Sequence, residues 1–333
     1  MQSQWSSTQR HGQSRPSQSS TSNRAHRDPS QRETLKATAQ ETRRVLPGLL
    51  NELNTTKQAS RALKYSFDSL PRLHPDLCPA YPQPATIRVL NDDTLNAAIR
   101  LSRSGQQSGQ DPNADADQHA LQPAVVNFAN RHSPGGGWLN GALAQEEALC
   151  YRSSLALSLN RKEHYPLATS EALYSPYVLV VREDMASGHR ISPAPASHLP
   201  VVSVLTVAAL HRPQVEVFEC KGRDGRAACS GSPPPKTRKK VFARDRDRDL
   251  TKCKMRLSLR MAAKHGHGML VLGAFGCGVY GNPPEDVAHC WLEVLREDEF
   301  SGNWWREVWF AVYDPKDEGN FGIFAQVLEG EQV

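Results

Sequence analysis

The sequence lacks any long apolar segment. No hydrophobic run approaches the roughly 20 residues that cross a bilayer, and the N-terminus has no apolar stretch typical of a secretory signal. The seven cysteines are scattered and never spaced C-x-x-C, which argues against both a disulfide framework and a zinc site. We therefore expect free thiols, no metal, no membrane association and an intracellular compartment, nuclear or cytoplasmic, with mitochondrial targeting as an alternative.

Residues 1–31 have almost no aliphatic side chains and are rich in Ser, Gln and Arg. A segment of this kind cannot bury enough apolar area to offset the entropy lost on ordering. It predicts a disordered tail, followed by one folded domain over residues 32–333.

Charge is concentrated in one part of the chain. The net charge of +5 and the pI near 8.8 favour anionic partners without specifying one. Residues 220–249 combine Gly, Ser and Pro with dense alternating charge, so we interpret them as a basic loop insertion outside the core. A solvated loop is the simplest role for it, and nuclear import or contact with a polymer are alternatives.

The domain shows an alternation of strand-like and helical segments. Residues 32–84 predict an N-terminal helical extension, with one or two helices interrupted at Pro47 and Gly48, and the core follows over residues 85–333. A helix capped by Asn91 or Asp92 is expected after the first core strand. Short apolar runs indicate strands at 86–90, 124–128, 177–181, 201–207, 269–272 and 308–312. Strands that are apolar on both faces predict an α/β fold with a mixed, mainly parallel sheet between two helical layers.

A glycine-rich motif follows the strand at 124–128. Gly135, Gly136 and Gly137 stand in a row, and Gln145-Glu146-Glu147 opens the next helix. Consecutive glycines are costly in backbone entropy, so they suit a turn with positive φ or a main chain that a ligand approaches, although a flexible linker is the alternative. We expect the helix to bury Ala148, Tyr151, Leu155 and Leu159 and to place both glutamates in its first turn. Ordinary helix capping is the simpler explanation for acidic residues there.

A second glycine loop lies near the end of the chain. Gly276-Cys277-Gly278-Val279-Tyr280-Gly281 spells G-x-G-x-x-G. A dinucleotide-binding fold is not indicated, because the loop falls in the last β-α unit and no acidic ribose ligand follows a second strand. Its glycine amides, next to the helix start at 282–284, still predict an anion-binding cradle.

The two motifs together resemble those of poly(ADP-ribose) glycohydrolases, in particular the compact microbial and fungal type. The first motif carries the resemblance through the three glycines, the seven-residue spacing and Gln145-Glu146-Glu147, preceded by residues 127–130. The second loop and residues 312–314 are also similar. The resemblance covers roughly residues 32–328 and implies a macrodomain-like three-layer α/β/α core.

The resemblance also implies roles for individual residues. Glu147 would be the catalytic acid/base, and Glu146 would hold ribose hydroxyls. The other substrate contacts implied are Asn130, Gly135, Gly136, Gly137 and Gln145 at the ribose, and Gly276, Cys277, Gly278, Val279, Tyr280 and Gly281 at the diphosphate and distal ribose.

The implied activity is hydrolysis of ribose–ribose bonds in poly(ADP-ribose), mainly from chain ends, with no cofactor. The partners would be poly(ADP-ribose) and ADP-ribosylated proteins, with ADP-ribose as product and a role in the DNA damage response. A mono-ADP-ribosyl hydrolase and a non-catalytic ADP-ribose-binding macrodomain stay open as alternatives. No direct binding of nucleic acid is expected, since only the basic loop supports it.

Overall fold

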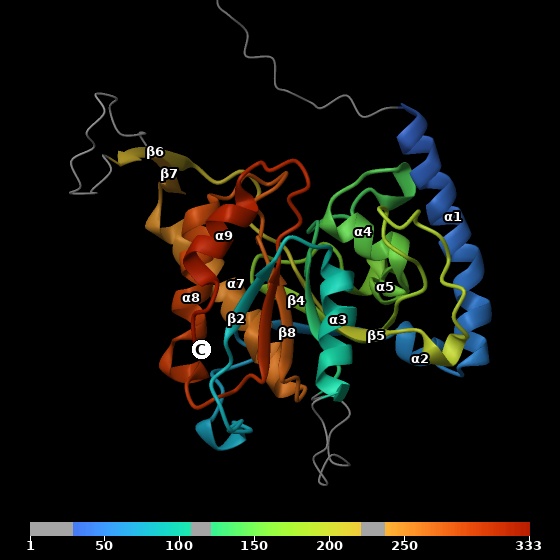
Figure 1. The fold of residues 1–333 in the computed structure, drawn as a ribbon, viewed down its shortest axis with the longest axis horizontal. Helices are drawn as coiled ribbons and strands as arrows, with labels where there is room; N and C mark the ends of the chain where they lie inside the picture. Colours follow the sequence, from blue (N-terminus) through green and yellow to red (C-terminus); the bar gives the residue numbers. More distant parts are fainter. Residues whose placement is uncertain (1–28, 108–120, 221–236) are drawn as a thin grey trace, which may run out of the picture.

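The computed structural model describes residues 29–107, 121–220 and 237–333 (Figure 1). A seven-stranded sheet in the order β1-β4-β5-β3-β8-β9-β2 forms its centre. Strands β5, β3, β8, β9 and β2 run parallel, whereas β4 is antiparallel to both β5 and β1. The mixed, mainly parallel sheet is therefore confirmed. Its strands are β1 (Leu63–Ser66), β2 (Ile87–Leu90), β3 (Ala124–Phe128), β4 (Glu171–Leu179), β5 (Val201–Val207), β8 (Met269–Gly273) and β9 (Glu307–Ala311).

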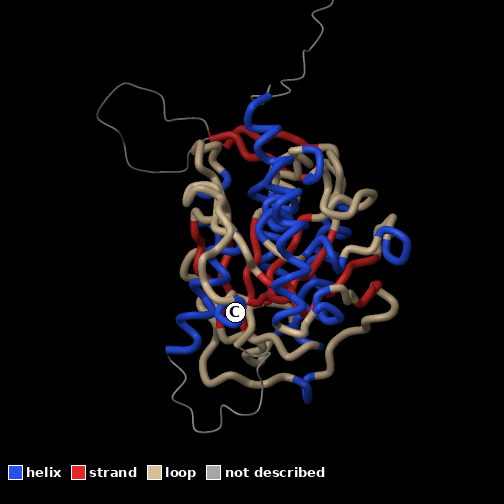
Figure 2. Tube along the Cα trace, turned by 90° about the vertical axis from the view of Figure 1, so that its right-hand side faces the viewer, coloured by secondary structure: helices blue, strands red, loops and turns tan. Residues whose placement is uncertain are grey.

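Helices cover both faces of this sheet (Figures 1 and 2). On β8, Val271 packs in an apolar cluster that includes residues of α1, α3 and α4, whereas Leu270 and Leu272 pack in a cluster with residues of α7, α8 and α9. Both faces of the strand are thus buried, which is why the sequence is apolar without alternation. The helices are α1 (Pro29–Glu52), α2 (Thr56–Ala59), α3 (Thr94–Gln107), α4 (Gln145–Arg152), α5 (Leu155–Ser158), α6 (Arg161–His164), α7 (Asp245–Lys264), α8 (Pro284–Leu295) and α9 (Asn320–Leu328). Short 3-10 turns lie at Pro75–Leu77, Trp138–Asn140 (η2), Ala196–His198 and Asp298–Phe300.

Helix α1 is continuous, so the predicted interruption at Pro47 is wrong. Pro47 and Gly48 lie on the exposed side of the helix, while Leu46 and Leu50 on the other side are buried. Burial of this apolar stripe offsets the backbone hydrogen bond that proline removes. The extension is also not only helical, because residues 63–66 form the edge strand β1. In the described part of the chain, no helix has the length and apolarity needed to cross a bilayer.

Two helix boundaries differ from the prediction. The side chain of Asp93, rather than Asn91 or Asp92, caps α3, because its Oδ1 accepts hydrogen bonds from the main-chain N–H groups of Leu95 and Asn96. Helix α4 ends at Arg152, so the buried Leu155 and Leu159 belong to the next segment.

The prediction of a loop over 220–249 is wrong for its described part. Residues Thr237–Phe242 form strand β7, which pairs antiparallel with β6 (Val215–Cys220), and α7 begins at Asp245. The buried side chain of Phe242 attaches β7 to the core. Asp245 and Asp247 fall in the first turn of α7, where negative charge is favourable, so the alternating charges are compatible with a helix. The remainder of the insertion, 221–236, and residues 1–28 of the predicted tail lie outside the described residues. Residues 29–31 of that tail form the start of α1, so the prediction of a disordered tail is wrong for them.

Candidate active site

Both glycine motifs lie at the carboxyl edge of the sheet. Strand β3 leads into the turn with Gly135–Gly137, and the adjacent strand β8 leads into the loop Gly276–Gly281. Burial raises the pKa of the Tyr280 hydroxyl, and the nearby carboxylates of Glu146 and Glu147 raise it further. Phe128 at the end of β3 packs against Phe275 just before the second loop, with ring centroids 5.9 Å apart, so the two motifs leave the same edge of the sheet side by side. This is the edge at which open α/β sheets bind their ligands.

The first glycine turn is tightly packed. Gly135 and Gly136 have φ angles of 68° and 59°, in the region that favours glycine. A Cβ on Gly136 would collide with Oε1 of Glu147 and lie 3.1 Å from Oε2 of Glu146, and a Cβ on Gly135 would lie 2.8 Å from Cδ1 of Trp138. Protein atoms therefore require these glycines. The alternative of a flexible linker does not fit this packing.

Glu146 is held on three sides. Its Oε2 accepts a hydrogen bond from the Asn130 N–H at 2.8 Å, while its Oε1 accepts one from the Gly135 N–H at 3.2 Å and one from Nδ2 of Asn127 at 3.4 Å. The residue is only 3% exposed. Burial raises its pKa to about 8, the charge of Glu147 adds to the increase, and the three N–H donors oppose it. Burial therefore favours the protonated form of Glu146.

Glu147 has a different environment. Its Oε1 accepts a hydrogen bond from the Gly137 N–H at 2.9 Å, the one donor recorded for it among the described residues, and the residue is 9% exposed. Its carboxyl group is thus anchored through one oxygen on the glycine turn. The two adjacent carboxyl groups differ in burial and in hydrogen bonding, as expected if they perform two different roles.

Gln145 attaches the start of α4 to the end of β3. Its Oε1 accepts a hydrogen bond from the Phe128 N–H at 2.9 Å, and its Nε2 donates to the Val126 carbonyl at 2.7 Å and to Oγ1 of Thr94 at 3.2 Å. The side chain thereby positions the two glutamates that follow it. This role was not foreseen from the sequence, and direct contact of Gln145 with substrate stays a prediction.

Asn130 shapes the turn between β3 and the glycines. Its Oδ1 accepts hydrogen bonds from the His132 N–H at 2.9 Å and the Ser133 N–H at 3.0 Å, and its own N–H donates to Glu146. Within the described part of the chain, its side-chain amide nitrogen, Nδ2, has no hydrogen-bond partner. That nitrogen can donate to a sugar hydroxyl, in keeping with the predicted ribose contact.

The second glycine loop is open, in contrast to the first. A Cβ on Gly278 or on Gly281 would have no heavy atom within 4 Å, and Val279 is 67% exposed. The thiol of Cys277 is buried, so this residue can offer a ligand only its main chain. Gly276 is the closed end of the loop, because its Cβ would lie 2.6 Å from that of Ala209.

The N-terminus of α8 follows this loop directly. The helix begins at Pro284, and Nδ2 of Asn282 donates to the carbonyls of Leu210 and Gly276 at 2.7 and 3.1 Å, which fixes the path of the chain into the helix. Helix N-termini with exposed glycine amides favour anions. Pro283 and Pro284 have no main-chain N–H, so only the glycine loop could supply amides, and the anion cradle stays a prediction.

Helix α1 supports the segment between Gly135 and Glu147, and this support was not predicted from the sequence. Oγ1 of Thr42 donates to the main-chain carbonyl of Tyr151 at 2.8 Å, and the Tyr151 hydroxyl lies 2.8 Å from the carbonyls of both Trp138 and Ala142. Nε of Arg32 also donates to the Asn140 carbonyl at 2.9 Å. These contacts hold η2 between the glycines and the glutamates. No sequence signal reveals them, because Thr42 and Tyr151 are 109 residues apart.

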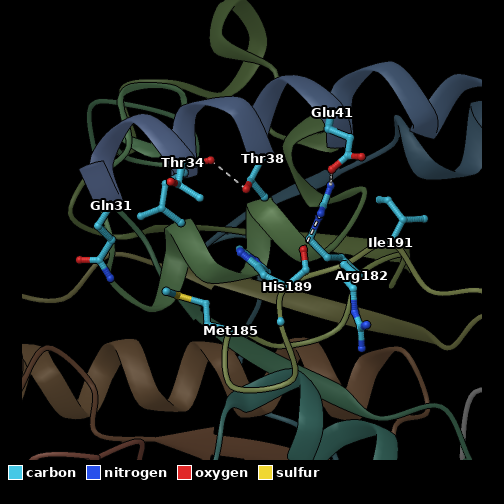
Figure 3. Close-up of a pocket in the computed structure, with 11 residues that line it drawn as sticks. Gln31, Thr34, Thr38, Glu41, Arg182, Met185, His189 and Ile191 are labelled. Atoms are coloured by element: carbon cyan, nitrogen blue, oxygen red, sulfur yellow. Dashed lines mark hydrogen bonds and ion pairs between the residues drawn. The ribbon is translucent and has the colours of Figure 1, made fainter. Parts of the chain in front are cut away.

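A cavity of about 470 Å³ lies elsewhere, between α1 and the segment 185–191 (Figure 3). Arg182 in its wall is bonded to Glu41 at 2.8 Å and to the His189 carbonyl at 2.6 Å. Neither Glu146, nor Glu147, nor the second glycine loop contributes to this cavity. It is therefore separate from the site at the sheet edge.

Comparisons with known proteins agree with this site. A family model described as the catalytic domain of microbial-type poly(ADP-ribose) glycohydrolase (PARG) matches residues 18–183, about half of the chain. That range includes the glycine turn and both glutamates. No curated protein matches the chain.

Solved structures match over more of its length. The PARG of Thermomonospora curvata is 27% identical, with a TM-score of 0.63, and the match covers 89% of this chain and 99% of that one. The same enzyme bound to the inhibitor ADP-HPD gives a TM-score of 0.62. PARG from Deinococcus radiodurans in complex with ADP-ribose is 26% identical, with a TM-score of 0.58, over 82% of this chain and 95% of that one.

Proposed function

We propose that this chain, which belongs to the microbial-type poly(ADP-ribose) glycohydrolase family, hydrolyses the ribose–ribose O-glycosidic bonds of poly(ADP-ribose) and releases ADP-ribose. One observation carries the proposal. Two buried carboxyl groups lie against a closed glycine turn, and an open glycine loop leaves the neighbouring parallel strand at the same sheet edge, just before a helix N-terminus. A glycosidase needs a carboxylic acid at the scissile bond, and a nucleotide diphosphate needs an anion cradle.

Glu147 is the proposed acid/base. Cleavage of the bond develops positive charge at the anomeric carbon, and the departing hydroxyl oxygen must receive a proton. Glu147 donates that proton and then accepts one from the attacking water. Anchoring of its Oε1 on the Gly137 N–H fixes the carboxyl group in one orientation and leaves Oε2 as the oxygen that exchanges protons.

Glu146 is proposed to hold ribose hydroxyls and to orient the sugar. Its hydrogen bonds to three N–H donors fix the side chain before substrate arrives. Burial raises its pKa to about 8, which favours its neutral form. It can also donate a hydrogen bond to a sugar oxygen.

The open loop is proposed to bind the ADP-ribose diphosphate through main-chain amides around Gly278, with Tyr280 over the distal ribose. Asn130 and the first glycine turn would contact that ribose from the other side. This arrangement supports the macrodomain-like description of the core, in which the ligand lies across the carboxyl edge of a mainly parallel sheet.

Three finer points are also proposals. The enzyme acts mainly at chain ends, its substrates in the cell include poly(ADP-ribosyl)ated proteins, and it reverses ADP-ribosylation after DNA damage. The family resemblance supports all three. An intracellular compartment stays a prediction from the sequence.

A comparison of three ligands tests the proposal. The protein is incubated with automodified poly(ADP-ribose) and with a singly ADP-ribosylated protein, and its binding of free ADP-ribose is measured by calorimetry. We expect release of ADP-ribose from polymer and a residual protein-linked unit. Binding without release would identify a non-catalytic reader, and removal of the protein-linked unit at a comparable rate would identify a mono-ADP-ribosyl hydrolase.

A further inference from the structure

The β6–β7 hairpin begins beside the active site. After β5 the chain passes along the second glycine loop, where the Arg212 N–H donates to the Tyr280 carbonyl at 2.8 Å. The His211 ring packs edge-on against the Tyr280 ring, with centroids 5.1 Å apart. The base of the hairpin therefore adjoins the second glycine loop, which leaves β8 beside the strand that leads to the first glycine turn.

Helix α8 fixes this hairpin on the body of the protein. The Lys240 N–H donates to Oε2 of Glu285 at 3.2 Å, and the Phe242 N–H donates to Oδ2 of Asp286 at 2.7 Å. Both acceptors lie in the first turn of α8, immediately after the proposed diphosphate loop. The outer part of the hairpin projects away from the helices, at the upper left in Figure 1.

The projecting part exposes apolar and basic side chains together. The register pairs Phe218 with Lys239 and Val217 with Lys240. Phe218 is 52% exposed, Val217 is 55% exposed, and both lysines are exposed. The two strands carry three basic residues, Arg238, Lys239 and Lys240, and two acidic ones, Glu216 and Glu219, so basic residues outnumber acidic ones there. Folding of this domain does not explain an exposed aromatic ring beside an ammonium group.

We propose that the β6–β7 hairpin binds the poly(ADP-ribose) units that adjoin the unit in the active site, an inference that rests on the proposed function. Each unit carries an adenine ring and a diphosphate. An exposed phenylalanine can stack on the base, and the neighbouring lysines can pair with the phosphates, which is the combination that binds single-stranded polyanions. The base of the hairpin lies at the second glycine loop, so polymer that extends from the bound unit past this loop can reach the exposed strands. The hairpin therefore increases affinity for long polymer and has no part in the chemistry.

Two substrates of different length test this role. We would measure kcat/KM for release of ADP-ribose from long poly(ADP-ribose) and from an ADP-ribose dimer, at several salt concentrations. The double variant Lys239→Ala/Lys240→Ala should lose about tenfold on long polymer and less than about twofold on the dimer. Loss of two phosphate contacts should also reduce the steepness of log(kcat/KM) on long polymer plotted against log salt concentration by about 1.4. Phe218→Ala should lose about fivefold on long polymer only.

The matched control is Lys57→Ala/Arg61→Ala, which removes two exposed basic residues at α2, far from the hairpin (Figure 1). It should leave both substrates unaffected. An equal loss on polymer and dimer, or no loss on either, would overturn the proposal. Competition by single-stranded DNA as effective as that by polymer would also overturn it, because the surface would then be a nucleic-acid site. If the wild-type protein released ADP-ribose from neither substrate, the proposed function itself would fail.

Discussion

The two glycine loops of this site require glycine for opposite reasons. In the first loop a Cβ on Gly136 would collide with the carboxyl group of Glu147, whereas in the second a Cβ on Gly278 would meet nothing within 4 Å. The first turn is closed by the protein's own carboxyl groups, those of Glu146 and Glu147. The second is open, as expected where a ligand must reach the main chain. A change of glycine should therefore damage catalysis and folding in one loop and ligand binding in the other.

The largest effect is expected from Gly136→Ala. The added methyl group collides with Glu147, and the residue must keep a φ of 59°. We expect turnover of poly(ADP-ribose) to fall at least about 100-fold, since small displacements of catalytic groups are that costly. Gly330→Ala is the matched control, because Gly330 also has positive φ, at 79°, and open space around it. Similar activity of the two variants would show that the closed turn does not position Glu147.

Gly278→Val tests the open loop. The new side chain fits into space that the protein leaves unfilled, so the unfolding temperature should not change. Affinity for free ADP-ribose, measured by calorimetry, should fall about tenfold because the amides can no longer be approached closely. Gly276→Ala is the contrasting variant, since its Cβ would meet Ala209 and should lower stability. Unchanged affinity in Gly278→Val would refute the diphosphate assignment.

A smaller effect is expected from Tyr151→Phe, which removes the hydroxyl that lies 2.8 Å from the carbonyls of both Trp138 and Ala142. We expect a loss of about 1–3 kcal/mol in the free energy of unfolding, together with a lower kcat. Tyr165→Phe is the control for stability, because the buried Tyr165 hydroxyl has no partner within the described residues. Urea denaturation measures the free energy of unfolding of both variants. Equal losses in the two variants would mean that the Tyr151 hydrogen bonds do not support the turn.

The smallest effect concerns pH. Burial raises the pKa of Glu146 from its ordinary value of 4.5 to about 8, so between these values the folded protein holds a proton that the unfolded chain has released. Stability must then fall as pH rises through this window, by at most about 1.4 kcal/mol per pH unit. Glu146→Gln, which mimics the neutral side chain, should flatten the dependence. An unchanged slope in Glu146→Gln would show that Glu146 is ionised in the folded protein.

The sequence predicted the parallel strands well, because strands buried on both faces read as continuous apolar runs. It predicted β4 less well, since only 177–181 was assigned and the strand begins at Glu171. Ser175 and Pro176 interrupt the apolar pattern there, and a register shift between Ser175 and Val178 accommodates them. Strand β7 was missed because Lys239 and Lys240 face solvent on a two-stranded hairpin, where no apolar alternation is required.

The site was predicted where the chemistry depends on residues near one another in sequence. The glutamates and glycines of the first turn lie within 13 positions, from Gly135 to Glu147, and the structure brings them together. The support from α1 could not be predicted, because a threonine in an amphipathic helix does not reveal which distant carbonyl it meets. The hydrogen bonds between the Gln145 side-chain amide and the main chain of β3 could not be predicted for the same reason.

The central claim is that Glu147 performs the proton transfers of poly(ADP-ribose) hydrolysis, and Glu147→Gln tests it most directly. Release of ADP-ribose from automodified polymer and binding of free ADP-ribose are measured for the wild-type protein, for this variant and for Glu163→Gln, a control at an exposed glutamate of α6. We expect wild-type and Glu163→Gln to release ADP-ribose at similar rates. Glu147→Gln should bind ADP-ribose normally but release it at least about 100-fold more slowly, as loss of a general acid/base predicts. A Glu147→Gln protein that keeps more than about a tenth of the wild-type rate would contradict the claim.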